Sequence, residues 1–307
     1  MSGFSFRILR IFILLTVFIS SAGQAAAGRA IVAVQSVPAR PYDEALEGFV
    51  QALAQVDYDL QRIILSESPG QEVKRQLDAT KPRLVLAIGM DALTQVADLT
   101  SMPVVYVMVL NPPDAIARTG EVTGVRMLVA PEKQLLIVQT ALPKIKTIGL
   151  LYDPQRSGQV VSRLQAAAER MDISIIAQKV TRTEQVPQAV LEMSPKIDLL
   201  WMLPDLTVVA PDTVEFLLLF AMESGKPLIT FSEKYVEQGA VLSIASDTRD
   251  MGRQAGQIAL KILGGTNVRD LPSEDAGKAV VTINLKVARK MGLQLDGKIL
   301  RTARILD

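Results

Sequence analysis

The sequence predicts an α/β protein made of two lobes, each built on a parallel β-sheet. Short runs rich in Val, Ile and Leu alternate with longer stretches whose apolar residues recur at helical spacing. The strand-like runs are apolar throughout, which is typical of parallel sheets covered by helices on both faces. The alternation restarts near Thr147, and a chain of 307 residues is long enough for two such units.

The first half of the chain reads as four strands separated by helices. The strands are predicted at residues 30–35, 60–65, 84–88 and 104–109, and the helices at residues 43–56 and 70–79. Ala45, Phe49 and Leu53 lie on one face of the first helix, which makes it amphipathic. Asn111-Pro112-Pro113 stops the fourth strand, and residues 122–127 are predicted to connect the two halves.

The second half repeats this pattern. Helices are predicted at residues 131–142, 158–171, 211–224 and 247–263, and strands at residues 147–152, 173–179, 199–203, 228–231, 241–245 and 279–283. Pro131 suits a first helical position, and Gly264-Gly265 ends the helix that begins at residue 247. A polar stretch at residues 272–278 precedes the last strand, and a short helix ends at Gly292.

The two lobes are expected to share a hinge with a cleft between them. No low-complexity tract separates the halves, so the chain is predicted to cross between lobes through short strand-like segments. The predicted boundaries assign residues 28–127 and 247–272 to the first lobe and residues 128–246 and 273–307 to the second.

The amino-terminal residues 1–27 have the pattern of a cleaved signal peptide. Arg7 and Arg10 precede an apolar run at residues 11–19, and Ala25-Ala26-Ala27 provides a small-residue cleavage site. The alternative, a membrane anchor, needs about 20 apolar residues to span the bilayer, and this run is much shorter. A periplasmic protein is therefore expected, and the absence of cysteine excludes a lipid-anchored lipoprotein.

The composition excludes several classes of function. The chain has no histidine and no cysteine, so it lacks the side chains of Ser-His-Asp or Cys-His nucleophiles and of thiolate zinc sites. The near balance of 33 Lys and Arg with 32 Asp and Glu argues against a nucleic-acid partner. No catalytic set, metal site or cofactor is predicted, and a monomeric protein that is not an enzyme is the expectation.

Two glycine patterns have the partial form of known motifs. Gly225-Lys226 lacks both ends of a phosphate-binding loop, because Phe220 and Pro227 occupy the flanking positions. Gly252 and Gly256 have the spacing that lets two helices pack closely, and close packing is the interpretation preferred here.

Polar residues gather at the carboxyl ends of the predicted strands, where open α/β sheets bind ligands. The candidate ligand-binding residues are Gln35, Ser36, Gly89, Met90, Asp91, Asn111, Tyr152, Asp153, Asp205, Phe231, Ser232 and Asp247. Backbone amides at Ser36 and Gly89-Met90-Asp91 suit a carboxylate, and Asp205 or Asp247 suits an ammonium group. Tyr152 or Phe231 can stack on an apolar portion of the ligand. The alternative is that many of these residues only cap the helices that follow.

Several segments resemble one known family. They are Thr123-Gly124-Val125, residues 146–154 (KTIGLLYDP), residues 239–243 (GAVLS), residues 247–252 with the helix to Gly265, and the terminal segment from Ile283 to Leu293. Together they resemble the ABC-transporter substrate-binding family related to tryptophan/tyrosine-type solute receptors. The resemblance implies the type I periplasmic-binding-protein architecture, with two Rossmann-like lobes, three crossovers and a ligand enclosed between the lobes.

The resemblance implies a function in ligand capture. The family's usual Gly-Thr-x-Ala is replaced by Gly89-Met90-Asp91-Ala92, and its Asp-Pro by Asn111-Pro112, so the ligand is left open, with an amino acid as the default. Two hypotheses follow. In the first, the protein delivers a small polar ligand to a membrane permease driven by an ATPase. In the second, it is an exported sensing module that signals to a membrane partner without transport.

Overall fold

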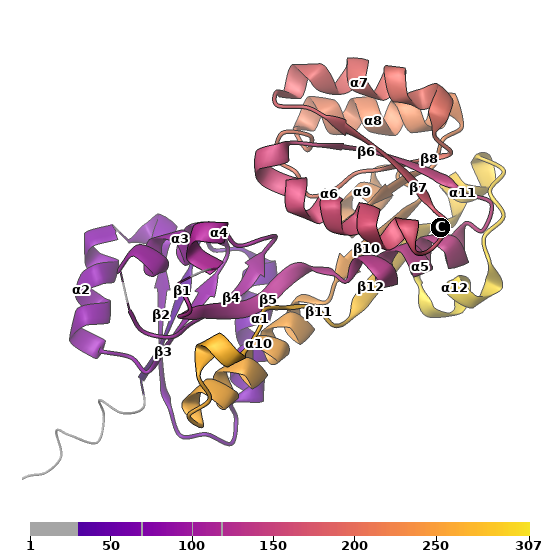
Figure 1. The fold of residues 1–307 in the computed structure, drawn as a ribbon. Coiled ribbons are helices and arrows are strands. Elements are labelled where there is room, and N and C mark those ends of the chain that lie inside the picture. The colour runs from indigo at the N-terminus through magenta and orange to yellow at the C-terminus, as the bar shows by residue number, and fades with distance from the viewer. Residues whose placement is uncertain (1–29, 69, 100, 118) are drawn as a thin grey trace, which may run out of the picture.

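The computed structural model describes residues 30–68, 70–99, 101–117 and 119–307, which form two lobes lying next to each other (Figure 1). The predicted signal peptide, residues 1–27, lies outside the described residues. Within those ranges, no helix combines the length and the apolar character needed to cross a membrane.

Six strands form the sheet of the first lobe, in the order β11-β5-β4-β3-β1-β2, and every neighbouring pair runs parallel. The strands are β1 (Ala30–Gln35), β2 (Asp59–Ile64), β3 (Leu84–Ile88), β4 (Val104–Val109), β5 (Val122–Val129) and β11 (Glu274–Ala276). All residues of β1 and β3 are buried, because helices cover both faces of the sheet. This explains why these strands are apolar at every position but the last of β1.

Helices α1 (Arg40–Ala52) and α10 (Thr248–Leu263) cover one face of this sheet, and α2 (Gly70–Thr80) and α3 (Met90–Leu99) cover the other. A short helix, α4 (Asp114–Ala117), follows β4. The packing of α1 on α10 is close, since a Cβ on Gly252 would lie 1.8 Å from the carbonyl oxygen of Ala45. The helix packing predicted at Gly252 and Gly256 is confirmed.

The second lobe has a sheet of seven strands in the order β13-β12-β10-β9-β8-β6-β7. Its strands are β6 (Thr147–Tyr152), β7 (Ser174–Lys179), β8 (Leu199–Trp201), β9 (Leu228–Thr230), β10 (Leu242–Ser246), β12 (Ala279–Asn284) and β13 (Arg304–Leu306). Its helices are α5 (Pro131–Ala141), α6 (Pro154–Glu169), α7 (Val186–Met193), α8 (Pro211–Ser224), α9 (Glu233–Glu237), α11 (Leu285–Lys290) and α12 (Gly297–Thr302). Only the pairing of β10 with β12 is antiparallel among the neighbouring strands of this sheet.

The two sheets share one topology, since β2-β1-β3-β4-β5 in the first lobe corresponds to β7-β6-β8-β9-β10 in the second. The predicted fold class, two α/β lobes with parallel sheets, is confirmed. In such sheets the strand order reverses beside the first strand, and ligands bind at that point, outside the carboxyl ends of the strands. Because both lobes have this topology, each lobe has one such position where a ligand can bind.

The chain crosses between the lobes three times. It crosses from β5 to α5, from β10 to α10 and from β11 to β12. Two predicted boundaries move as a result. β5 continues to Val129, and residues 274–276, assigned from the sequence to the second lobe, form an edge strand of the first sheet because β11 pairs with β5.

Other differences from the predicted elements have local causes. The first helix begins at Arg40 instead of residue 43, and the helix expected from residue 158 begins at Pro154, because a proline occupies the first turn of each. Residues 122–127, predicted as a connection, belong to strand β5. The pattern missed α3, α7 and the carboxyl-terminal strand β13.

Candidate functional site

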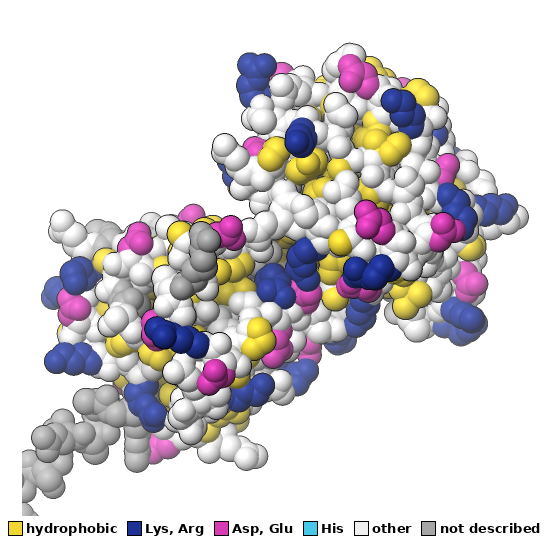
Figure 2. Space-filling model, in the orientation of Figure 1, with side chains coloured by type: hydrophobic (Ala, Val, Ile, Leu, Met, Phe, Trp, Pro, Cys, Tyr) yellow, Lys and Arg dark blue, Asp and Glu magenta, His cyan; other side chains and the backbone are white. Residues whose placement is uncertain are grey.

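Two adjoining cavities lie between the lobes. The first has a volume of about 620 Å³ and is lined from the first lobe by Tyr42, Met90, Thr94, Met108, Leu110, Asn111, Pro113, Asp114 and Met127, and from the second by Pro154, Gln155, Arg156, Gly158, Gln159, Pro204 and Leu206. The second has a volume of about 590 Å³. Because Met108 and Met127 line both, the two cavities form one cleft, at the place where the molecule narrows between the lobes (Figure 2).

The wall contributed by the first lobe is apolar at its centre. Met90, Met108 and Met127 are each half-buried and face the cleft. From the second lobe, Leu206 faces the same cavity and is 72% exposed. Thioether and aliphatic groups offer dispersion contacts and no strong hydrogen bond, so this part of the cleft suits the apolar portion of a ligand.

The charged side chains in the second cavity are paired within the protein. The Nε of Arg40 lies 2.9 Å from Glu44, and an Nη of Arg304 lies 2.8 Å from Glu233. Asp247 accepts a hydrogen bond of 2.7 Å from the Nζ of Lys278. These pairs neutralise the rim of the cleft without a ligand.

The pKa of the Asp247 carboxyl reflects this pairing. Partial burial raises the pKa, but hydrogen bonds from Lys278 and from the backbone of Asp250 outweigh it and hold the pKa below its usual value. The hydrogen bond from Thr248 and the neighbouring Arg40 lower the pKa of Glu44 in the same way. Both carboxylates therefore remain ionised at neutral pH.

The first cavity contains one bridge between the lobes. Gln159 on α6 accepts a hydrogen bond from the side chain of Asn111 and donates one of 2.7 Å to Asp114. A second bridge lies near the crossings, where Asp275 on β11 binds Arg126 on β5 and Arg163 on α6. Because Gln159 and Arg163 are four residues apart on α6, one face of this helix contacts the first lobe.

The structure brings five of the predicted site residues to the cleft. Met90 and Asn111 line the first cavity, and Phe231, Ser232 and Asp247 line the second. The remaining predicted residues do not line either cavity; they are Gln35, Ser36, Gly89, Asp91, Tyr152, Asp153 and Asp205.

Ser36 and Gly89 lie behind the cavity wall. The Oγ of Ser36 accepts a hydrogen bond of 3.0 Å from the backbone N–H of Ala92, which lies in the first turn of α3 and has no acceptor within the helix. Gly89 has φ +95°, and a Cβ there would lie 2.5 Å from the Oγ of Ser36 and 2.9 Å from the hydroxyl of Tyr42. The tight turn at Gly89 therefore lets Tyr42 lie over the end of β3.

Asp205 belongs to a buried group that we call the carboxylate cluster: Asp153, Ser157, Asp205 and Thr207. Asp205 accepts hydrogen bonds from the backbone of Asp153 (2.8 Å), the backbone of Thr207 (2.9 Å) and the hydroxyl of Ser157. Asp153 caps α6 through the backbone of Gln155 and accepts a bond of 2.8 Å from Thr207. This cluster joins the ends of β6 and β8 and is already hydrogen-bonded at each carboxylate.

Several residues that line the cleft were not predicted from the sequence: Tyr42, Met108, Met127, Arg156, Gln159 and Leu206. The predicted set consists mainly of polar residues that directly follow strands, so the methionines within β4 and β5 and the exposed Leu206 were left out. The signal available for Met108 and Met127 was their position at the ends of two buried strands. Arg156 was missed because α6 was predicted to begin four residues too late, and Gln159 because it lies within the predicted helix and not at the end of a strand.

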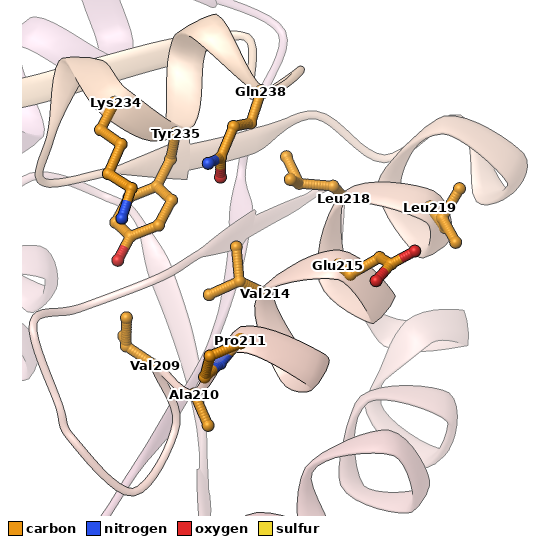
Figure 3. A pocket seen from close by; sticks show the side chains of 10 residues that line it. All are labelled: Val209, Ala210, Pro211, Val214, Glu215, Leu218, Leu219, Lys234, Tyr235 and Gln238. Atoms are coloured by element: carbon orange, nitrogen blue, oxygen red, sulfur yellow. The ribbon is translucent and has the colours of Figure 1, made fainter.

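A further cavity, of about 560 Å³, lies on the second lobe alone (Figure 3). Lys234, Tyr235 and Gln238 face Val214 and Leu218 of α8 across it. All of the residues that line this cavity belong to the second lobe. Among the residues described, no group of three or more acidic side chains is placed to hold a metal ion.

Comparison with known proteins supports the resemblance noted in the sequence. Residues 30–305 match the family model for ABC transporter substrate binding protein. The chain is 24% identical over 269 residues to a tyrosine-binding protein of Clostridioides difficile (strain R20291), an alignment that covers 82% of this chain and 77% of that protein.

Solved structures agree in fold. A ligand-free, open substrate-binding protein with adhesive properties from Clostridium difficile matches with a TM-score of 0.73 at 22% identity, covering 91% of this chain and 99% of the other. An ABC domain in complex with L-Trp from Streptococcus pneumonia matches with a TM-score of 0.66 at 24% identity, with the same coverage. With two parallel-dominated sheets and three crossings, the architecture is of the type I periplasmic-binding-protein kind, and the chain belongs to the ABC transporter substrate-binding protein family.

Proposed function

We propose that this protein is the exported receptor of an ABC importer, which captures a small polar ligand, an amino acid or a similar compound, between its two lobes. The observation that supports this most strongly is a cleft lined by both lobes, with three chain crossings beside it. A ligand that contacts both walls stabilises the closed arrangement by its differential affinity for that arrangement. The exposed side chain of Leu206 is one surface that closure would bury.

The first cavity has groups suited to an amino acid. Arg156 lies at the start of α6, and its nearest carboxylate, Asp153, is 3.8 Å away and already engaged by other donors. The ion pair with Asp153 is long, so the guanidinium of Arg156 can turn its remaining N–H groups toward a ligand carboxylate. Asn111 and Asp114, now bridged by Gln159, can accept the hydrogens of an ammonium group.

Aromatic amino acids are the first ligands to test. One relative is named for tyrosine binding, and one structural neighbour holds L-Trp. The apolar wall formed by Met90, Met108 and Met127 agrees with an aromatic or other apolar side chain.

The proposed setting is the periplasm, which the protein would reach through cleavage of the predicted signal peptide at residues 1–27, without a lipid anchor. There it would act as a monomer and present the closed form to a membrane permease and its ATPase. No catalytic step is needed for this role, and the partner complex would supply the energy for transport.

Isothermal titration of the exported form with a panel of amino acids tests the proposal. We expect binding of at least one aromatic amino acid, and a loss of roughly tenfold or more in affinity for Arg156→Gln, because one charge-assisted pair contributes about 1.5–3 kcal/mol. Arg170→Gln is the matched control, since Arg170 lies at the other end of α6 and pairs with Glu132. Failure of the unmodified protein to bind any amino acid or related metabolite would contradict the proposed ligand class.

The transport role needs a separate measurement. Deletion of the gene should reduce uptake of the radiolabelled ligand by cells, and expression of the unmodified protein should restore it. Uptake that is unchanged by the deletion, together with binding in solution, would favour a sensing function.

A further inference from the structure

Strand β4 carries one extra residue at its carboxyl end. Tyr106 pairs with Gly124 of β5, but the next pairing joins Val109 to Arg126. Three steps along β4 thus correspond to two steps along β5, which defines a β-bulge. Met108 lies within this bulge.

The bulge changes the direction of the Met108 side chain. Before it, Val105 and Val107 pack in the core beneath α1 and α10, and Val104 and Tyr106 pack on the opposite face. Simple alternation would place residue 108 with the second group. Met108 instead packs beside the first group and lines both cavities, and Val109 returns to the opposite face.

Met108 adopts a backbone conformation that its side chain disfavours. Its φ is +60°, in the left-handed region that glycine occupies without steric cost and that a residue with a long side chain rarely adopts. Strain of this kind persists where the surrounding structure enforces it, and it is concentrated at ligand sites. Folding alone would favour glycine at this position.

The neighbours of Met108 make the wall adaptable. Met127 lines both cavities and Met90 lines the first, so three flexible thioether side chains line the same cleft. Unbranched methionine side chains change rotamer to fit differently shaped apolar groups. The charged residues around the second cavity are paired with one another, whereas the thioethers of the three methionines need no hydrogen-bonding partner.

We infer that Met108 is a specificity-determining residue, and that with Met90 and Met127 it makes the receptor broad for amino acids with large apolar side chains, aromatic and long aliphatic alike. This inference rests on the proposed function, since it describes the side-chain subsite of the same cleft. Met108 would set which side chains fit, whereas the carboxylate and ammonium of the ligand bind elsewhere.

The test compares three proteins against L-Trp, L-Tyr, L-Phe, L-Met and L-Leu by isothermal titration, with thermal unfolding in parallel. For the unmodified protein we expect affinities within about tenfold of one another, because adaptable packing reduces differences among apolar groups. Met108→Gly should weaken binding of all five by roughly tenfold, through loss of a buried side-chain contact. Its unfolding midpoint should stay the same or rise, since glycine relieves the strain at φ +60°.

Met108→Leu provides a second readout, because it conserves volume but replaces a flexible chain with a branched one. We expect the spread of affinities among the five ligands to widen by about tenfold. Met171→Leu in the second lobe is the control, since Met171 packs against the core of that lobe, outside the cleft. It should change neither the affinities for the five ligands nor the spread among them.

The outcomes separate the two proposals. Absence of any binding by the unmodified protein would contradict the proposed function itself. Binding that Met108→Gly and Met108→Leu both leave unchanged would overturn the role of Met108 alone. A preference above about a hundredfold for one ligand by the unmodified protein would overturn the inferred breadth, and a folding defect in Met108→Gly would leave the decision to Met108→Leu.

Discussion

The carboxylate cluster and the methionines of the cleft, Met90, Met108 and Met127, occupy comparable places in the two lobes. Both lie at the carboxyl ends of parallel strands, where ligands bind in folds of this kind. They differ in hydrogen bonding and exposure. Asp205 is 1% exposed and accepts three hydrogen bonds, whereas the methionines are half-buried and have no strong partner to lose.

A position at the end of a strand therefore indicates where in the fold a ligand binds, but not which side chains contact the ligand. A buried carboxylate whose oxygens already accept hydrogen bonds must give up those bonds before it can bind a ligand, and the donors would be left without partners. A thioether has no such bonds to give up. We therefore propose that the carboxylate cluster stabilises the second lobe and that Met90, Met108 and Met127 contact the ligand.

The largest loss of stability is expected from Asp205→Ala. If the variant were as stable as the unmodified protein, the structural role of the carboxylate cluster would be wrong. The substitution leaves the backbone N–H groups of Asp153 and Thr207 and the hydroxyl of Ser157 without an acceptor. Each unsatisfied buried donor costs about 1–3 kcal/mol, so we expect a loss of about 3–5 kcal/mol and a fall of roughly 10 °C in the unfolding midpoint. Thermal unfolding followed by circular dichroism measures it.

Asp212→Ala is the control for this prediction. Asp212 is an exposed residue in the first turn of α8, so its removal should cost only about 0.5 kcal/mol. An Asp205→Ala protein of unchanged stability that no longer binds ligand would reverse the assignment and make Asp205 a ligand residue.

An intermediate effect is expected at Asp275, where the two lobes meet near the crossings. Partial burial raises the pKa of this carboxyl, but hydrogen bonds from Arg163 and Arg126 outweigh it and lower the pKa below the usual value. A lowered pKa in the folded state contributes stability above the unfolded-state pKa of about 3.9, and that contribution is lost as the pH falls through the folded-state pKa. The stabilisation should therefore be complete at pH 7.

Asp275→Asn tests this sign. At pH 7 we expect the variant to be less stable by roughly 2 kcal/mol, the contribution of hydrogen bonds to a charged group. The gap between the variant and the unmodified protein should narrow as the pH falls below about 4. Urea unfolding at several pH values measures this difference in stability. A difference that stays constant below about pH 4 would show that the ionised Asp275, paired with Arg126 and Arg163, is not its source.

Met127→Ala is expected to lower stability less than Asp205→Ala or Asp275→Asn, and it tests the role of the methionines. Met127 is half-buried at the cleft, so truncation should cost only about 1 kcal/mol in stability. Ligand affinity should fall by roughly tenfold, because the side chain lines both cavities. Titration calorimetry with thermal unfolding separates the two quantities, and a large loss of stability with unchanged affinity would make Met127 a core residue.

Much of the fold was predictable because buried parallel strands have a strong local signature. The ranges 84–88, 104–109 and 147–152 agree with β3, β4 and β6 at both ends, and 211–224 agrees with α8. The sequence pattern predicted an element less well where that element forms only by pairing with a strand far away in the chain. β11 has three residues and an exposed, polar start, so only its pairing with β5 makes it a strand.

The candidate site was predicted less well than the fold. Asn111 and Asp247 were found because polar residues at strand ends are conspicuous in the sequence. Met108 was not found, because its direction depends on a bulge whose register is set by β5, and a methionine in a buried strand looks like core.

Most of the buried strands, the two-lobe plan and the absence of imidazole and thiol chemistry could be read from the sequence, since these follow from local pattern and composition. Tertiary structure decided which strand-end residues remain available to a ligand. That choice depends on hydrogen bonds between distant segments, such as Asp205 with Ser157, and on a bulge that turns Met108 into the cleft. Neither is a property of neighbouring residues in the chain, because both arise only when strands are brought into register.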